Sequence, residues 1–408
     1  MQFELQGRTD AGRDLVSLAE RLAGDFATRA GDHDREGSYP FESIRALRET
    51  GYLAAPVPRE LGGLGVESVH DLLVASSRLA RGDPAVAIGV NMHLIPVTNM
   101  AHRWRAAVLC GDERRAGAFG RSLEQVVGDG VVMAAAISEP SQDLTRPATI
   151  ARRTAEGWAV DGRKIFCTMS PAATLLYTAV TFEDEDGAER YGYALIPADA
   201  PGVRMHDDWD ALGMRASGSQ SVSFEDVRLP VGALRGGFPA GRLTGDWMDR
   251  NLNAGAFHAA ASVGIAEAAH HEALAALASR GGVVDSPRAQ TLAAENAIEL
   301  SAVRAVFGRA GALLDEHDVR SAGAPVADEK VAALFAEVQS AKTFVNEVAV
   351  RVVDRALALA GGAGYMSRHP LSRAYRDVRA GAFMQPLSAA RAYDFIGRLA
   401  VGAEAVLR

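Results

Sequence analysis

Apolar residues recur at helical intervals through the first third of the chain. One helical face is formed by Leu15, Leu18, Leu22 and Phe26. Pro40 begins a second helix, and a glycine-rich turn precedes a further helix expected over residues 67–80. Residues 1–130 are therefore predicted to form a helical domain.

The pattern changes in the middle of the chain. The stretches GWAVDGRKIFCTMS, LLYTAVTF, RYGYALIPA and QSVSFEDVRLP are short and rich in β-branched and aromatic residues. Turn residues such as EDEDG separate them, as expected for strands. Residues 131–235 are predicted to form a β domain, a small barrel or sandwich.

Strand signals end near Asp246, and long alanine-rich segments follow. Apolar residues from Val331 to Val348 recur at intervals of three and four, which is typical of helices packed in a bundle. Residues 236–408 are predicted to form a C-terminal four-helix bundle. The fold class is therefore α+β, with helices, then a β domain, then helices.

Composition excludes several classes of protein. The 408 residues carry a net charge of −8 with no concentration of Lys and Arg, which argues against a nucleic-acid partner. No apolar run approaches the roughly 18 residues of a membrane span, and the start lacks a signal-peptide layout, so we expect a cytoplasmic protein. Cys110 and Cys167 lack further ligands at metal spacing, so both are expected in the core and no metal site is predicted.

Five motifs, in order along the chain, resemble those of the acyl-CoA dehydrogenase superfamily. They are YPFESIRALRETGYLAAPVPRELGGLG, AAAISEPSQDLT, DGRKIFCTMS, LGMRASGSQSVSFEDVRLP and LALAGGAGYMSRHPLSRAYRDVRA. Each motif is weak by itself, but their shared order is strong evidence for this fold. The resemblance implies a flavin, FMN or FAD, between the β domain and the C-terminal bundle.

The resemblance also implies which residues hold the flavin. Ser138 would face the pyrimidine edge of the ring, Thr168 would donate to N5, and Phe166 would cover a ring face. The alternatives are a turn hydroxyl for Ser138 and a core aromatic for Phe166. Gly361, Gly362 and Gly364 would approach the cofactor of a neighbouring subunit, or form only a helix C-cap. A homotetramer or homodimer is therefore expected.

The chain departs from the family at its catalytic base. The usual base is a Glu nine residues after the Arg of the Arg-Asp pair, and here that position is Gln385. An amide cannot accept the α-proton, although it can orient a substrate. A minority branch of the family carries its base just before an Arg on the first C-terminal helix, which makes Asp249 and Arg250 candidates. The alternative for Asp249 is a helix cap or dipole partner.

Two further departures indicate a looser grip on flavin. Arg280 stands where the family holds the adenine half of FAD, but the following Phe-Gly is absent. The flavin loop also lacks the Gly-Ser-Asp that would receive the diphosphate. This combination is similar to the monooxygenase branch of the family, which takes reduced flavin from a separate reductase and needs a shielded cavity. His93 and His258 are candidate substrate residues, or hydrogen-bonded core histidines.

Three functions follow as hypotheses. The favoured one is a two-component flavin monooxygenase that uses O₂ on a small-molecule, biosynthetic substrate. The second is a desaturating dehydrogenase of acyl-CoA or acyl-carrier-protein thioesters, with Asp249 as displaced base. The third is a non-catalytic member of the fold.

Overall fold

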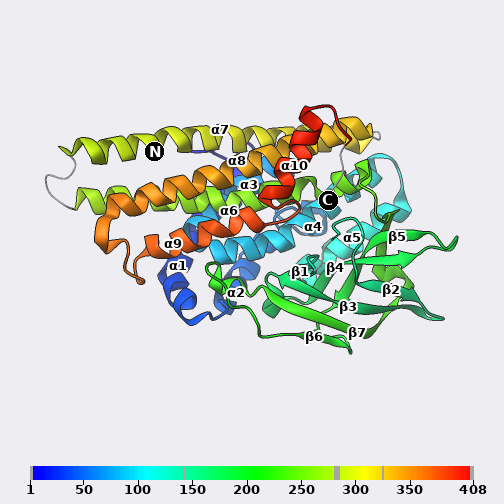
Figure 1. Ribbon diagram of the computed structural model, residues 1–408. Coiled ribbons are helices and arrows are strands. Elements are labelled where there is room, and N and C mark those ends of the chain that lie inside the picture. Colours follow the sequence, from blue (N-terminus) through cyan, green and yellow to red (C-terminus); the bar gives the residue numbers. More distant parts are fainter. Residues whose placement is uncertain (1–2, 141–142, 280–284, 324–325, 405–408) are drawn as a thin grey trace.

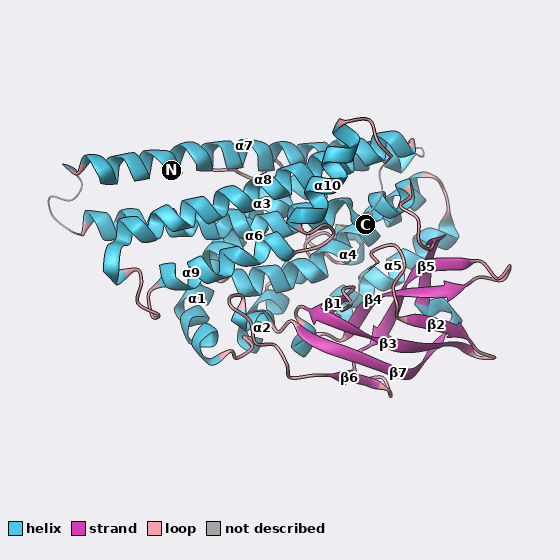
Figure 2. Ribbon diagram, in the orientation of Figure 1, coloured by secondary structure: helices cyan, strands magenta, loops and turns pink. Residues whose placement is uncertain are grey.

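The fold is known from a computed structural model that describes residues 3–140, 143–279, 285–323 and 326–404. Helices form most of the molecule, and one sheet lies at one end (Figures 1 and 2). The helices before the sheet are α1 (Asp10–Glu36), α2 (Phe41–Glu49), α3 (Val69–Gly82), α4 (Pro84–Leu109) and α5 (Glu113–Gly128). Those after it are α6 (Gly245–Ala278), α7 (Pro287–Gly323), α8 (Asp328–Ala360), α9 (Pro370–Asp377) and α10 (Ala389–Ala400). The predicted order of helices, strands and helices is confirmed.

Local sequence sets where the helices begin and end. The Thr9 hydroxyl accepts from the Gly12 N–H at 2.9 Å at the start of α1, and Gly37 ends that helix with a φ of 67°. Asp83 caps α4, with Pro84 in the first turn. The long helix α6 starts behind Thr244, whose side chain accepts from the Trp247 N–H at 3.2 Å.

The sheet is built from strands of unequal length. They are β1 (Met133–Ala136), β2 (Ile150–Arg153), β3 (Gly157–Cys167), β4 (Leu175–Glu183), β5 (Glu189–Pro197), β6 (Val203–Met205), β7 (Gln220–Pro230) and β8 (Leu234–Pro239). The strand order is β6-β7-β3-β2-β4-β5-β8, and β1 pairs with β4. The pairs β1–β4 and β2–β4 are parallel, whereas the remaining neighbours run antiparallel. Strand β8 extends past residue 235, the end predicted for the β domain.

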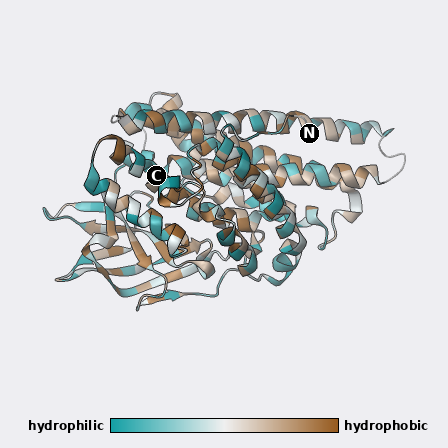
Figure 3. Ribbon diagram, turned by 180° about the vertical axis from the view of Figure 1, so that it is seen from behind, coloured by the Kyte–Doolittle hydropathy of each residue, from teal (hydrophilic) through white to brown (hydrophobic). Residues whose placement is uncertain are grey.

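Three cores of buried apolar residues hold the molecule together, and the smallest lies between α4, α5 and β1. In the helical part, α6 packs along α8 through buried residues such as Phe257 and Phe335, each of which stabilises the fold by roughly 1.5–3 kcal/mol. The sheet has its own core around Trp158 and Phe224. Hydrophobic and hydrophilic residues alternate along the helices, as expected for helices with one buried face (Figure 3).

Both cysteines were expected in the core, and this prediction is confirmed for Cys167 and wrong for Cys110. Cys167 is buried, but Cys110 is exposed. Cys110 is the C-cap of α4, and its thiol lies 3.7 Å from the Ala322 carbonyl oxygen of α7. A helix end at the surface explains this position, because Cys110 follows Val108 and Leu109 of the last turn of α4, which are exposed as well.

Candidate functional site

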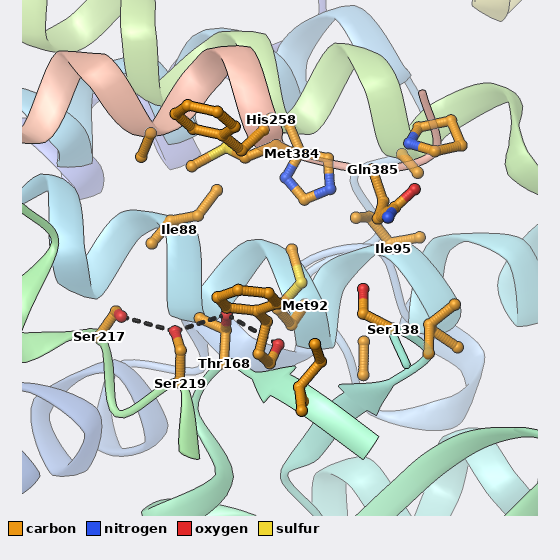
Figure 4. A pocket seen from close by; sticks show the side chains of 18 of the residues that line it. Ile88, Met92, Ile95, Ser138, Thr168, Ser217, Ser219, His258, Met384 and Gln385 are labelled. Carbon is orange, nitrogen blue, oxygen red and sulfur yellow. Dashed lines mark hydrogen bonds between the residues drawn. The ribbon is translucent and has the colours of Figure 1, made fainter. Parts of the chain in front are cut away.

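A cavity of about 590 Å³ lies where the sheet meets the helices, and we call it the central cavity. Its wall comes from α4, the ends of β1 and β3, strands β4 and β5, the loop 209–219, the first half of α6 and the segment 376–386. Figure 4 shows His258, Met384 and Gln385 on one side of the cavity, with Thr168 and Ser219 on the opposite side. Most of this wall is apolar, and a few polar groups point into it, which is the usual composition of a small-molecule site.

A chain of hydroxyls lies on the sheet side of the central cavity. Thr168 Oγ1 is 2.8 Å from Ser219 Oγ, which is 2.7 Å from Ser217 Oγ (Figure 4). Next to it, Phe166 adopts a positive φ of 53° and lies edge-on to Trp209, with ring centroids 5.9 Å apart. A left-handed backbone is unusual for a bulky residue. It occurs at a bulge near the end of β3 and leaves Phe166 58% exposed on the cavity wall.

The carboxylate of Glu139 lies at the wall of the central cavity but already accepts hydrogen bonds from neighbouring residues. It accepts from Lys164 Nζ at 2.7 Å, from Thr149 Oγ1 at 2.7 Å and from the Ala148 N–H at 2.6 Å. Burial raises its pKa, but the charge of Lys164 and these hydrogen bonds outweigh it, so the pKa of Glu139 is below its usual value. Among the described lining residues Glu139 is the single carboxylate, and it is not a free base.

Gln385 lines the cavity at the position predicted for the missing base. The segment that carries it is tied to α8 by Lys342, a fully buried side chain. Its ammonium donates to the carbonyls of Met384, of Gln385 at 3.2 Å and of Leu387 at 2.7 Å. Burial lowers the pKa of Lys342 to about 7. This residue therefore fixes the backbone of the segment that presents Gln385.

The Arg-Asp pair of the family motif has a structural role here. Arg376 binds Asp34 of α1, with one N–O distance of 2.8 Å. Asp377 is buried and accepts from the Met214 N–H at 2.5 Å. Burial raises the pKa of Asp377 to about 7. The pair thus joins α9 to the N-terminal domain and to the loop that carries Met214 on the cavity wall.

Three cavity residues on α6 hold polar atoms without hydrogen-bond partners among the described residues. These atoms are Nε1 of Trp247, Nε of Arg250 and Nδ1 of His258. Burial, with a smaller contribution from Lys342, lowers the pKa of His258 to about 3, so its imidazole is neutral. The guanidinium of Arg250 lies 5.7 Å from the rings of Tyr193 and Phe238. Buried polar atoms left without partners point to a missing ligand.

Asp249 is placed in a different cavity. This second cavity, of about 360 Å³, is lined by polar and some apolar residues of α4, α6 and α7 and of the start of α5. Asp249 Oδ1 is 2.7 Å from His317 Nε2, and Oδ2 is 3.6 Å from Arg103. Burial raises the pKa of Asp249, but the hydrogen bond and charge of His317 bring it below the usual value. The geometry therefore shows an ion-paired carboxylate outside the lining of the central cavity.

Five further predicted residues lie away from the central cavity or outside the described residues. His93 is fully buried; its Nε2 donates to the Leu53 carbonyl at 2.9 Å and its Nδ1 accepts from the Met133 N–H at 3.1 Å. His93 is therefore a hydrogen-bonded core histidine, as the alternative prediction for this residue had it. The glycines Gly361, Gly362 and Gly364 follow the C-terminal end of α8, where Gly361 has a φ of 66°. Arg280 lies outside the described residues.

The central cavity fits a planar aromatic cofactor. Its volume falls within the roughly 300–1,000 Å³ of ordinary ligand sites. Ser138, Phe166, Thr168, Arg250, His258 and Gln385 were predicted from the sequence, and the structure brings all six to its wall. Hydroxyls on one wall and unpartnered nitrogens on the other would meet the polar edge of a flavin ring.

The sequence analysis did not predict three residues that hold other groups in place. Glu139 and Lys164 form an ion pair at the cavity wall, and Lys342 holds the backbone of the segment that carries Gln385. For Lys342 a signal existed, because it follows Val338 by four residues and precedes Val345 by three, on the apolar face of α8. A cation on such a face needs a buried partner.

The described residues contain no group of His, Cys, Asp or Glu arranged to hold a metal ion. Within the same residues, no helix combines the length and the apolar character that crossing a membrane requires.

Several known proteins are similar to this chain in sequence over nearly its whole length. The chain is 34% identical to the L-evernosamine nitrososynthase of a Micromonospora strain, over 97% of this chain and 91% of that protein. It is 33% identical to the amino sugar nitrososynthase DnmZ of Streptomyces peucetius, over 97% and 95%. A solved structure, KijD3 in complex with FMN and dTDP-3-amino-2,3,6-trideoxy-4-keto-3-methyl-D-glucose, superposes with a TM-score of 0.88 at 33% identity. The match covers 98% of this chain and 96% of that chain.

Three family models match in the order that the fold requires. The N-terminal domain of acyl-CoA dehydrogenase matches residues 9–104, the middle domain residues 134–227 and the C-terminal domain residues 246–385. These matches correspond to the first helices, the sheet and the C-terminal helices. By architecture, sequence motifs and these matches, the chain belongs to the acyl-CoA dehydrogenase family.

Proposed function

We propose that this protein is a flavin-dependent monooxygenase that transfers an oxygen atom to the amino nitrogen of a sugar substrate. The family membership and the relatives support a flavin oxidoreductase. The finer proposal rests on one observation, which is that the central cavity has no carboxylate free to act as a base. Gln385 replaces the base, and Glu139 is bound to Lys164. A cavity without a free carboxylate suits oxygen transfer to a nucleophilic nitrogen better than removal of an α-proton.

The flavin would lie against the sheet side of the central cavity, with FMN the favoured form. Thr168, Ser138 and Phe166 would hold its ring. Reduced flavin, when bound, supplies two electrons and activates O₂, so that one oxygen atom goes to nitrogen and the other leaves as water. The apolar wall formed by Ile88 and Met92 excludes water.

Residues of α6 and the segment 376–386 would position the amine. Neutral His258 has one ring nitrogen without a protein partner, so that nitrogen can form a hydrogen bond with the substrate amine. Gln385 can orient the same group by hydrogen bonding. Both side chains point into the cavity from the wall opposite Thr168 (Figure 4).

Two features of the assembly are also proposed. Reduced flavin would come from a separate reductase. The protein would form a homotetramer or homodimer, because Tyr365 is 82% exposed and Met366 is 53% exposed beside the glycine turn. Apolar side chains exposed together are typical of a subunit interface.

The test is isotope transfer from ¹⁸O₂. Photoreduced FMN and an amino sugar nucleotide are mixed with the protein without oxygen, ¹⁸O₂ is admitted, and the product is analysed by mass spectrometry. One ¹⁸O atom on nitrogen is the expected result. If instead an acyl thioester bleaches bound oxidised flavin and no amine gains oxygen, the protein is a dehydrogenase and the proposal is wrong.

A further inference from the structure

One helix in the wall of the central cavity contains a proline in its interior. Helix α4 presents Ile88, Met92, Pro96 and Asn99 to the cavity, at intervals of three or four residues along one helical face. Figure 4 shows Ile88 and Met92 of this row at the cavity. Pro96 lies in the middle of the helix, which continues without interruption from Pro84 to Leu109.

A proline has no backbone N–H, so it leaves one carbonyl of its helix without the usual donor. Each N–H of an α-helix donates to the carbonyl four residues earlier, and for Pro96 that residue is Met92. Thr98 bears the only hydroxyl side chain in α4, and its oxygen has no hydrogen-bond partner among the described residues. No other described side chain donates to the Met92 carbonyl in its place. The helix therefore leaves this carbonyl oxygen available as an acceptor.

The free carbonyl lies on the side of α4 that faces the central cavity. A helix carbonyl points along the axis toward the residue four positions ahead, so the Met92 oxygen lies between the side chains of Met92 and Pro96. Both of these side chains line the cavity. Most of the surrounding wall is apolar, and the Glu139 carboxylate already accepts from Lys164. A backbone oxygen in such a wall is a strong acceptor that carries no charge.

We infer that the Met92 carbonyl oxygen accepts a hydrogen bond from the amino group of the substrate, and that Pro96 is the positioning residue that keeps this oxygen free. This inference deepens the proposed function and rests on it. Burying an amine N–H without an acceptor is unfavourable, so the cavity has to supply acceptors. A neutral primary amine has two N–H bonds and one lone pair. With one N–H on Met92 and the other on Gln385 or His258, the lone pair stays free to attack oxygen.

Pro96→Ala tests the inference, because it restores an N–H that donates to the Met92 carbonyl. Isothermal titration calorimetry on the full-length protein compares two probes: the amino sugar nucleotide of the isotope experiment, and the same nucleotide with hydrogen in place of the amino group. The wild type should bind the amino compound about fivefold more tightly than the deoxy compound, as expected for one or two added hydrogen bonds. In Pro96→Ala this ratio of affinities should fall about threefold or more, since the amine loses an acceptor.

The same variant should be more stable than the wild type, which a merely disruptive substitution would not be. Proline in a helix interior is less favourable than alanine, so the thermal midpoint should rise by about 2 °C or more. Pro84→Ala is the matched control. Pro84 occupies the first turn of the same helix, where an N–H has no acceptor within the helix, and it lines neither cavity. Its replacement should leave the ratio of affinities unchanged.

Ile95→Ala separates the acceptor from the shape of the cavity. Ile95 lines the cavity beside Pro96, and its truncation removes apolar contacts without adding an N–H to the helix. Both probes should bind this variant more weakly, while the ratio of their affinities stays that of the wild type. An unchanged ratio in Pro96→Ala, or an equal fall of the ratio in Ile95→Ala, would overturn the inference.

Failure of the inference and failure of the proposed function give different results. If the ratio falls in Pro96→Ala but the wild type transfers no ¹⁸O to an amine, the acceptor is supported and the oxygenation is wrong. If ¹⁸O reaches the amine but the wild type and Pro96→Ala show the same ratio, the oxygenation is supported and the acceptor is wrong.

Discussion

The two cavities differ in how their polar groups are paired. In the second cavity the carboxylates have basic partners: Asp249 binds His317, Asp318 lies 3.1 Å from His102, and Asp112 lies 3.9 Å from Arg115. In the central cavity the wall is mostly apolar, and atoms of His258 and Arg250 lack partners among the described residues. Groups that already satisfy one another stabilise a fold, whereas buried groups without partners are available to a ligand.

The difference explains why Asp249 and Gln385 have separate roles. Asp249 lies on the first turns of α6, beside Arg250, but its side chain turns to the polar cavity. Gln385 reaches the central cavity on a segment held by Lys342. Residues adjacent in a helix point in different directions, since each step turns by about 100°.

The largest expected effect is that of Lys342→Met. Three backbone carbonyls would lose a charged donor, and the segment of Gln385 would move. We expect oxygenated product to fall about 100-fold, because displacement of a positioning segment by about 1 Å has effects of this size. The free energy of unfolding should fall by about 3 kcal/mol.

Rate and urea denaturation of Lys342→Met are measured together, with Lys330→Met as control. Lys330 is exposed in the first turn of the same helix. A variant that loses stability but keeps full product yield would contradict the positioning role.

Gln385→Leu tests the amide directly. The substitution keeps the side chain's approximate size and removes its hydrogen-bonding groups, so we expect the rate of amine oxygenation to fall about tenfold. Thermal stability should change little. The readout is the ratio of oxygenated product to reduced flavin consumed. If that ratio matches the wild type, Gln385 does not orient the substrate.

Acid should destabilise the protein through His258. Its pKa is about 3 when folded, against about 6.5 for an ordinary histidine. Between these values the unfolded chain binds a proton that the folded chain does not, so stability is lost as the pH falls below about 6.5. At pH 5 this loss amounts to about 2 kcal/mol.

The measurement is chemical denaturation of wild type and His258→Gln at pH 7.5 and pH 5. The variant should lose less stability on acidification than the wild type does. His206→Gln, a half-buried histidine at Ser223 in the sheet, is the control. An identical pH response in wild type and His258→Gln would refute the prediction.

Asp249→Asn should have the smallest effect. Asp249 is 35% exposed and its partners face the second cavity, so we expect stability to fall by no more than about 1 kcal/mol. Product yield should stay within about threefold of the wild type. Loss of activity toward an acyl thioester in this variant would instead favour the dehydrogenase hypothesis.

The order of the three regions could be predicted because it depends on local pattern. Apolar residues recur at helical spacing around Leu22 and Phe26, and β-branched and aromatic residues are frequent near Trp158. Both patterns predict the type of element directly from neighbouring residues. The motifs also predicted Ser138, Thr168 and Gln385, which line one cavity. The absence of a base at residue 385 is a property of the sequence alone.

Only the tertiary structure decided which polar groups meet. Lys342 lies 42 residues or more from the carbonyls it binds, and Glu139 lies 25 residues from Lys164. His93 and His258 both follow apolar residues, yet only His258 faces the cavity. Sequence fixes periodicity, which is a local property of the backbone. The partner of a buried charge depends on distances between segments that folding brings together, and no local pattern contains them.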